Sequence, residues 1–210
     1  MKLKICGIRT QEMFYSCVKF SVDFLGFNFT PSSKRKINPA KALKFFENKN
    51  LNQIQTVAIF QNQNLDEIKN ILKIFPAKIL QFHGNEDINF LQEIKKKFPQ
   101  KKIWKAFSID QNFDFKILKK IDLCDSFLFD GKNPGSGQRI LVDDLKKVTD
   151  FAGGMKKNFG VAGGVCTENI DFFKNNFPKT EFLDIASGVE KNQKFDFKLL
   201  EKIVYLMRKK

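Results

Sequence analysis

The chain has 210 residues, of which 42% are hydrophobic, and its 37 Lys and Arg against 23 Asp and Glu give a formal net charge of +14. This length is enough to bury one full core and leaves no room for a second, so we expect residues 1–210 to form one domain. A positive charge of this size would favour binding to nucleic acid. The lysines, however, occur in every expected helix, and no aromatic side chains on which bases could stack alternate with them. That pattern favours solvated helix faces and no nucleic-acid partner.

The cysteines and the apolar segments indicate a cytoplasmic protein without a membrane partner. The four cysteines have neither C-x-x-C nor metal-ligand spacing, and the chain has one histidine, so a zinc site is not expected. The first ten residues have too short an apolar stretch for a signal peptide, and no run is long enough to span a membrane. We therefore expect reduced thiols in the cytoplasm.

Short β-type runs alternate with longer helical patterns along the chain, which predicts a parallel sheet covered by helices. Eight such repeats predict an α/β fold of the closed (β/α)8 TIM-barrel type, at the lower limit of its usual length of about 200 to 250 residues. An open doubly wound sheet is disfavoured because Cys6-Gly7-Ile8-Arg9 is not a dinucleotide-binding loop. The expected strands are Lys2–Cys6, Phe24–Phe29, Thr56–Phe60, Lys78–Phe82, Ile103–Phe107, Ser126–Asp130, Asn158–Ala162 and Phe182–Ala186, and the clearest helices are Asp66–Phe75 and Phe197–Met207.

Cys6 ends the first expected strand, and Gly7 opens the loop that follows. A free cysteine in a strand is most often a small buried hydrophobe, but at this end of a barrel strand it lies where such folds keep their chemistry. If Cys6 faces the barrel interior, so does Lys4, about 7 Å below it. Lys4 is then expected to lower the pKa of the thiol, unless an acidic residue such as Asp184 engages it.

Two further features fall at later strand ends. Asp130 ends the sixth strand, where its carboxylate is equally well read as a cap for the next loop or as a functional group. Gly163-Gly164 and Ser187-Gly188 follow strands seven and eight, the loops with which barrel enzymes commonly bind phosphate through backbone N–H groups. Either pair alone is also typical of an ordinary turn. Arg35, after strand two, has the default interpretation of a solvated basic turn.

Together the segments KICG, SSKR, QFHG, FLFDGKNPGSG, GVAGG and LDIASGVE resemble the phosphoribosylanthranilate isomerase family of tryptophan biosynthesis. The resemblance implies an Amadori rearrangement of N-(5-phosphoribosyl)anthranilate that needs no cofactor and no metal. It implies that Cys6 is the general base and Asp130 the general acid. Arg35 would recognise the anthranilate carboxylate.

The same resemblance implies binding roles for the remaining residues. His83 would line the pocket, and Asp184 would bind the ribose hydroxyls or pair with a lysine inside the barrel. Gly135-Ser136-Gly137 would cover the phosphate, next to Gly163-Gly164 and Ser187-Gly188. This sequence departs from the family pattern at Ala186, where a serine is usual, and in a shorter loop from Gly131 to Arg139.

Three alternatives remain open at the level of sequence. Another sugar-phosphate barrel, such as a histidine-pathway isomerase or indoleglycerol phosphate synthase, would share the phosphate loops but uses carboxylates or a lysine at strand one. A basic nucleic-acid-binding protein would make Cys6 and Asp130 incidental, and a thiol redox protein lacks a resolving cysteine near Cys6. The expected partner is one phosphorylated small molecule, and the chain is either a monomer or a homodimer.

Overall fold

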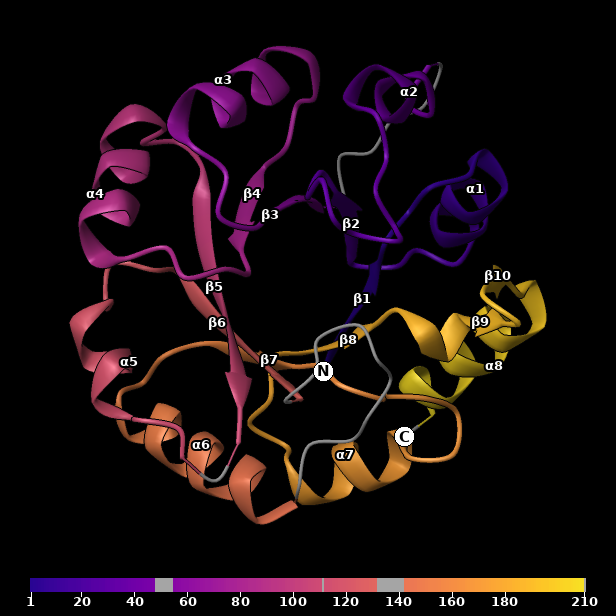
Figure 1. The fold of residues 1–210 in the computed structure, drawn as a ribbon. Coiled ribbons are helices and arrows are strands. Elements are labelled where there is room, and N and C mark those ends of the chain that lie inside the picture. Colours follow the sequence, from indigo (N-terminus) through magenta and orange to yellow (C-terminus); the bar gives the residue numbers. More distant parts are fainter. Residues whose placement is uncertain (48–54, 111, 132–141, 210) are drawn as a thin grey trace.

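A computed structural model describes residues 1–47, 55–110, 112–131 and 142–209 and forms a closed barrel of eight parallel strands surrounded by helices (Figure 1). Neighbouring strands pair in chain order, and β1 closes the barrel on β8 with Lys4 beside Asp184. The barrel strands are β1 Lys2–Cys6, β2 Phe24–Asn28, β3 Gln55–Phe60, β4 Ile79–Phe82, β5 Lys102–Ile109, β6 Ser126–Gly131, β7 Phe159–Val161 and β8 Phe182–Ile185. The predicted (β/α)8 barrel is confirmed.

The helices form the outer ring, and several begin at residues whose side chains satisfy free backbone N–H groups. Thr10 accepts from the N–H of Met13, and Asn64 and Glu67 form a reciprocal capping box. The helices are α1 Gln11–Lys19, α2 Pro39–Lys44, α3 Leu65–Ile74, α4 Ile88–Lys97, α5 Lys116–Lys120, α6 Val142–Gly154, α7 Ile170–Asn176 and α8 Phe197–Arg208. None of the helices in the described ranges is long and apolar enough to cross a bilayer.

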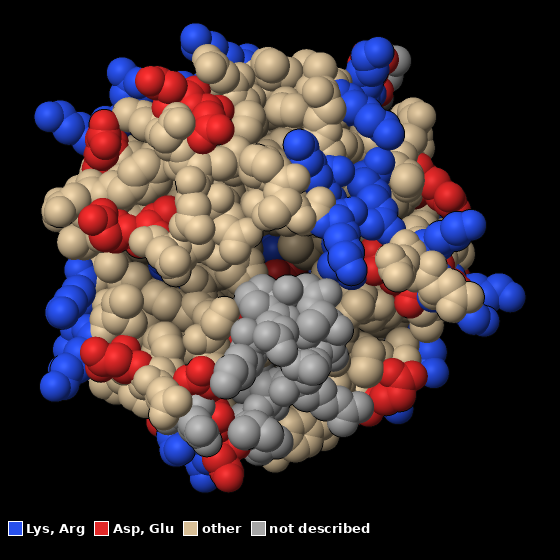
Figure 2. Space-filling view, in the orientation of Figure 1, with Lys and Arg blue, Asp and Glu red and all other residues tan. Residues whose placement is uncertain are grey.

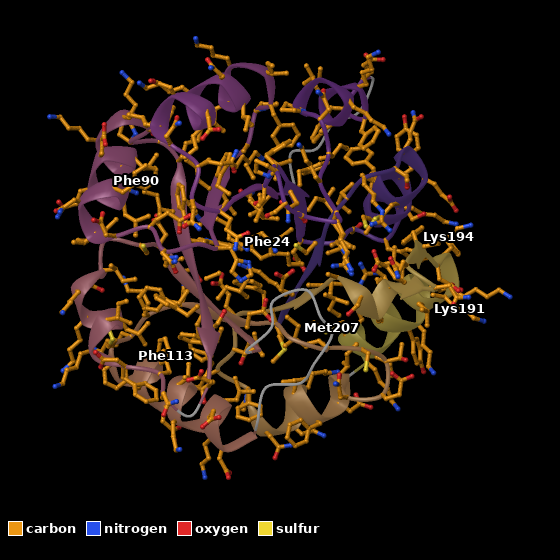
Figure 3. The ribbon with its side chains drawn as sticks, in the orientation of Figure 1. Phe24, Phe90, Phe113, Lys191, Lys194 and Met207 are labelled. Carbon is orange, nitrogen blue, oxygen red and sulfur yellow. The ribbon has the colours of Figure 1, made fainter. Side chains whose placement is uncertain are left out.

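Two buried layers hold the barrel together. The larger layer lies between strands and helices, and the partly buried Phe90 on α4 packs against it (Figure 3). The smaller layer fills the barrel interior, where the Trp104 ring stacks on Phe182 with centroids 4.5 Å apart and meets Phe24 edge-on at 4.9 Å. Gly160 makes room for this packing, because a Cβ there would lie 2.3 Å from the Phe182 ring.

One short segment after β8 was not predicted from the sequence. A 3₁₀ turn, η1 Ser187–Val189, leads into a hairpin of β9 Glu190–Lys191 and β10 Lys194–Phe195. Asn192 and Gln193 form its tip with positive φ angles of 51° and 61°. Neither residue is glycine, so the sequence offered a weak turn signal, yet this hairpin places Glu190 at the barrel mouth.

Candidate active site

The carboxyl ends of the strands surround a cavity of about 450 Å³. Figure 2 shows a hollow on this face of the molecule, with Lys and Arg side chains gathered beside it near β2 and α1. Eight of the residues singled out in the sequence line the cavity: Cys6, Arg35, His83, Asp130, Gly163, Gly164, Asp184 and Ser187. Gly135, Ser136 and Gly137 lie outside the described residues.

Cys6 faces the barrel interior at the end of β1, and the chain turns sharply after it. The N–H groups of Gly7 and Ile8 both donate to the carbonyl of Gly26, at 2.9 Å each, and Gly7 has a φ of +84° that favours glycine. Burial raises the pKa of the Cys6 thiol to about 11, while the nearby cations of Lys4 and Arg35 act in the opposite direction. The lowered thiol pKa expected from Lys4 is not found, because burial outweighs its charge.

Lys4 lies fully buried beneath Cys6 and is paired with Asp184. Its Nζ donates to Asp184 Oδ2 at 2.7 Å, as the register of β1 and β8 permits. Burial is the largest single influence and opposes the ammonium form, but the charges and hydrogen bonds of Asp184 and Cys6 together outweigh it and raise the pKa of Lys4. Lys4 is therefore a buried cation held between Asp184 and the thiol. Asp184 Oδ1 has no hydrogen-bond partner among the described residues and lies at the cavity.

Asp130 is the penultimate residue of β6 and lines the cavity. Its Oδ1 accepts from the N–H of Gly131 at 2.8 Å, and its Oδ2 lies 3.5 Å from His83 Nε2. Burial, helped by the charge of Asp184, raises the pKa of Asp130 to about 7 despite the opposing Gly131 N–H and Lys4. A carboxyl group with such a pKa holds a proton that it can donate near neutral pH.

His83 directly follows β4, with its ring beside Asp130, and is neutral. Burial, helped by the cations of Lys4 and Lys105, lowers its pKa to about 4. The Lys105 cation is itself paired with Glu86 Oε2 at 3.0 Å. His83 Nε2 is buried without a hydrogen-bond partner in the described part of the chain. It therefore stands beside the Asp130 carboxyl as a polar neighbour rather than as a second charge.

The glycines after β7 and β8 bring their two loops together. Gly163 has a φ of +94°, and a Cβ there would lie 2.6 Å from the backbone nitrogen of Gly131 and 3.0 Å from Asp130 Oδ1. Gly188 lies behind the cavity lining, where a Cβ would be 2.3 Å from the carbonyl oxygen of Val165. These glycines are needed for close backbone approach, and Gly163 also fixes the surroundings of Asp130, a contact that the sequence did not indicate.

Arg35 lies in the loop after β2 and is not the solvated basic turn of the default interpretation. Its guanidinium bonds Glu190 through two atoms, with Nε 3.1 Å from Oε1 and Nη2 2.6 Å from Oε2. Arg9 Nη2 lies 3.2 Å from the same Glu190 Oε1. Sequence reasoning missed Glu190 as the partner of Arg35, although Glu190 ends the LDIASGVE segment.

The fold and the cavity define a (β/α)8-barrel enzyme whose mouth holds a protonatable carboxyl group, a thiol and a guanidinium. The described residues contain no group of three His, Cys, Asp or Glu side chains arranged to hold a metal ion. It stays a prediction that the reaction needs no cofactor and no metal.

Comparisons with known proteins identify the family. The family model described as N-(5'-phosphoribosyl)anthranilate (PRA) isomerase matches residues 3–205. The isomerase of that name from Staphylococcus aureus strain MRSA252 is 31% identical over 211 residues, covering 99% of this chain and 97% of its own. The chain therefore belongs to the PRA isomerase family and is an isomerase of tryptophan biosynthesis.

Solved structures share the fold across the whole chain. Phosphoribosylanthranilate isomerase from Thermus thermophilus has a TM-score of 0.85 at 24% identity, covering 99% of this chain and 98% of its own. The isomerase from Thermotoga maritima has a TM-score of 0.86 at 23% identity and covers 98% of both chains. Another was solved with reduced 1-(o-carboxyphenylamino)-1-deoxyribulose 5-phosphate and has a TM-score of 0.80 at 22% identity, covering 97% of this chain and 96% of its own.

Proposed function

We propose that Asp130 and Cys6 are the general acid and the general base with which this isomerase carries out the Amadori rearrangement of N-(5-phosphoribosyl)anthranilate to 1-(2-carboxyphenylamino)-1-deoxyribulose 5-phosphate. The observation that carries the proposal is that one cavity is lined both by a buried carboxyl group with a pKa of about 7, on β6, and by the Cys6 thiol at the end of β1. The whole chain, residues 1–210, acts as one catalytic domain.

The reaction begins with ring opening. Asp130 donates its proton to the furanose ring oxygen while the bond between that oxygen and C1 breaks, and the amine lone pair forms a Schiff base. The Cys6 thiolate then takes the proton from C2, which gives an enolamine, and tautomerisation yields the ketone. In the tautomerisation the Cys6 thiol gives its proton to C1 and the Asp130 carboxylate takes the proton of the C2 hydroxyl, so Asp130 and Cys6 both return to their starting states.

Asp130 and Cys6 differ in how far the free protein holds each of them in the protonation state that its role requires. Asp130 is protonated at and below about pH 7, as an acid requires, whereas the thiolate of Cys6 is the minor form until about pH 11. Lys4 and Arg35 are the cations that favour the thiolate. Each proton transfer by a placed group contributes roughly 10² to 10⁴ in rate, and substrate positioning contributes the rest.

The remaining residues of the cavity bind the two ends of the substrate. Arg35 binds the anthranilate carboxylate, and Asp184 Oδ1 accepts a hydrogen bond from a ribose hydroxyl. Backbone N–H groups at Gly163-Gly164 and Ser187-Gly188 bind the phosphate, with Gly135-Ser136-Gly137 as its cover. His83 lines the pocket. The partner is thus a phosphorylated small molecule, with no nucleic acid involved, and the enzyme works in the cytoplasm as a monomer or a homodimer.

Loss of phosphoribosylanthranilate fluorescence, with substrate generated in situ, tests the proposal. The wild-type protein is expected to remove the signal rapidly, and Asp130→Asn and Cys6→Ser in matched preparations are expected to lower the rate by at least about 10². Wild-type decay no faster than the uncatalysed background would overturn the reaction. Rapid decay that survives both substitutions would overturn the residue roles alone.

A further inference from the structure

The guanidinium of Arg35 is held at one edge by a buried carboxylate. Nε and Nη2 bond the two oxygens of Glu190 at 3.1 and 2.6 Å, and the side chains of Arg35 and Glu190 are 17% and 8% exposed. This two-atom pairing matches the planar fork of arginine to the carboxylate and fixes the plane of the guanidinium as well as its distance.

The aliphatic part of Arg35 is fixed independently. It lies directly over the backbone of Gly7, where a Cβ would come within 2.5 Å of Arg35 Cδ. The backbone N–H of Arg35 also donates to Ser33 Oγ at 3.1 Å. Gly7 thus lets the side chain cross the end of β1 beside Cys6, and Glu190 then orients the group at its tip.

A guanidinium has two edges that suit a carboxylate. The edge formed by Nε and Nη2 is occupied by Glu190, whereas Nη1, which completes the end edge with Nη2, makes no hydrogen bond to a described residue. Arg9 supplies a second cation to Glu190, at 3.2 Å from Oε1. One carboxylate therefore stands between two arginines, and a net positive charge remains for an anion in the cavity that Arg35 lines.

We propose that Glu190 is a positioning residue for substrate recognition, which occupies the side edge of the Arg35 guanidinium so that its end edge meets the ring carboxylate of the substrate. The inference rests on the proposed function, because it takes Arg35 as the group that binds this carboxylate. Glu190 itself does not touch the substrate. It removes the rotational freedom that Arg35 would otherwise lose on binding.

Glutamine at position 190 keeps the shape of the side chain but loses its charge and one of the two accepting oxygens. The guanidinium then has no carboxylate to hold its plane, and binding of the ring carboxylate weakens by about tenfold, the scale of one charge-assisted hydrogen bond. Because this contact is present both in the bound substrate and in the transition state, the change appears in KM while kcat stays nearly constant.

Two competitive inhibitors separate this role from a structural one. The first is reduced 1-(o-carboxyphenylamino)-1-deoxyribulose 5-phosphate, and the second is the same reduced compound without its ring carboxylate. Inhibition constants are measured for the wild type, Glu190→Gln, Glu190→Asp and Arg35→Lys. The matched control is Glu181→Gln, which removes a carboxylate that pairs with Lys2 at 3.1 Å at the opposite end of the barrel.

The wild type and the control are expected to prefer the first inhibitor, and Glu190→Gln to lose about tenfold of that preference while binding the second unchanged. Glu190→Asp, which keeps a carboxylate, recovers part of the loss. Unchanged preference in Glu190→Gln, with preference lost in Arg35→Lys, would overturn the role of Glu190 and leave that of Arg35 intact. Equal weakening of both inhibitors in Glu190→Gln and Glu190→Asp would mark a structural role and overturn the inference. A wild type without turnover would overturn the proposed function itself.

Discussion

Replacing Asp130 by asparagine is expected to stabilise the folded protein above neutral pH while it abolishes turnover. The side chain is 5% exposed, and burial raises its pKa from 3.8 to about 7. The fold therefore disfavours the ionised carboxylate. Asparagine has nearly the same shape and stays neutral, and its Oδ1 is able to accept from the Gly131 N–H as Asp130 does.

The size of the effect follows from the pKa shift. A carboxyl group whose folded pKa is raised contributes fully to stability below about pH 4, and the contribution is lost as the pH rises through about 7. The rise from 3.8 to about 7 is roughly three pKa units, or about 4 kcal/mol at 1.36 kcal/mol per unit. This is a large part of the 5 to 15 kcal/mol by which domains are usually stable.

Urea unfolding of both proteins at a series of pH values between about 4 and 8 measures the effect. The free energy of unfolding of Asp130→Asn minus that of the wild type should increase by about 4 kcal/mol over this range and level off above pH 7. Other titrating groups are common to both proteins and largely cancel in the difference. A difference that does not change with pH would show that Asp130 has an ordinary pKa, and it would refute the argument for a protonated acid.

Three further changes test the rest of the site. Below about pH 7, kcat/KM should fall with decreasing pH because the Cys6 thiolate is lost. Above about pH 11 it should fall because protonated Asp130 is lost, and between these two pH values it should stay constant. A maximum confined to about pH 5 to 6 would contradict the assignment of acid and base. Lys4→Met should destabilise the protein by about 3 to 5 kcal/mol because it leaves Asp184 unpaired, and thermal melts should show that Lys4→Met/Asp184→Asn recovers most of this loss. Gly163→Ala, whose Cβ would lie 2.6 Å from the backbone nitrogen of Gly131 on β6, should lower kcat/KM at least about tenfold in the fluorescence assay, and an unaffected variant would show that the loop has room to move.

The sequence by itself determined the architecture, because local hydrophobic periodicity and capping residues predict the alternation of strands and helices. Lys2–Cys6 was bounded as observed, and the strand predicted to end at Asp130 runs one residue further, to Gly131. Positions at the ends of parallel strands could be assigned to one cavity before any coordinates, since a closed barrel brings those ends together. Cys6 was found in this way, whereas position left Asp130 open between a cap and a functional group, and the family resemblance indicated its role.

Only the tertiary structure decided how the charges inside that cavity balance. A pKa depends on burial and on neighbours that are distant in sequence, so the neutral state of His83 and the high pKa of the Cys6 thiol were not predictable from strand parity. The same holds for Glu190, which is 155 residues from Arg35 and reaches it through a hairpin with a weak turn signal. Local sequence specifies which groups arrive at the barrel mouth, and packing across the barrel specifies which of them are paired.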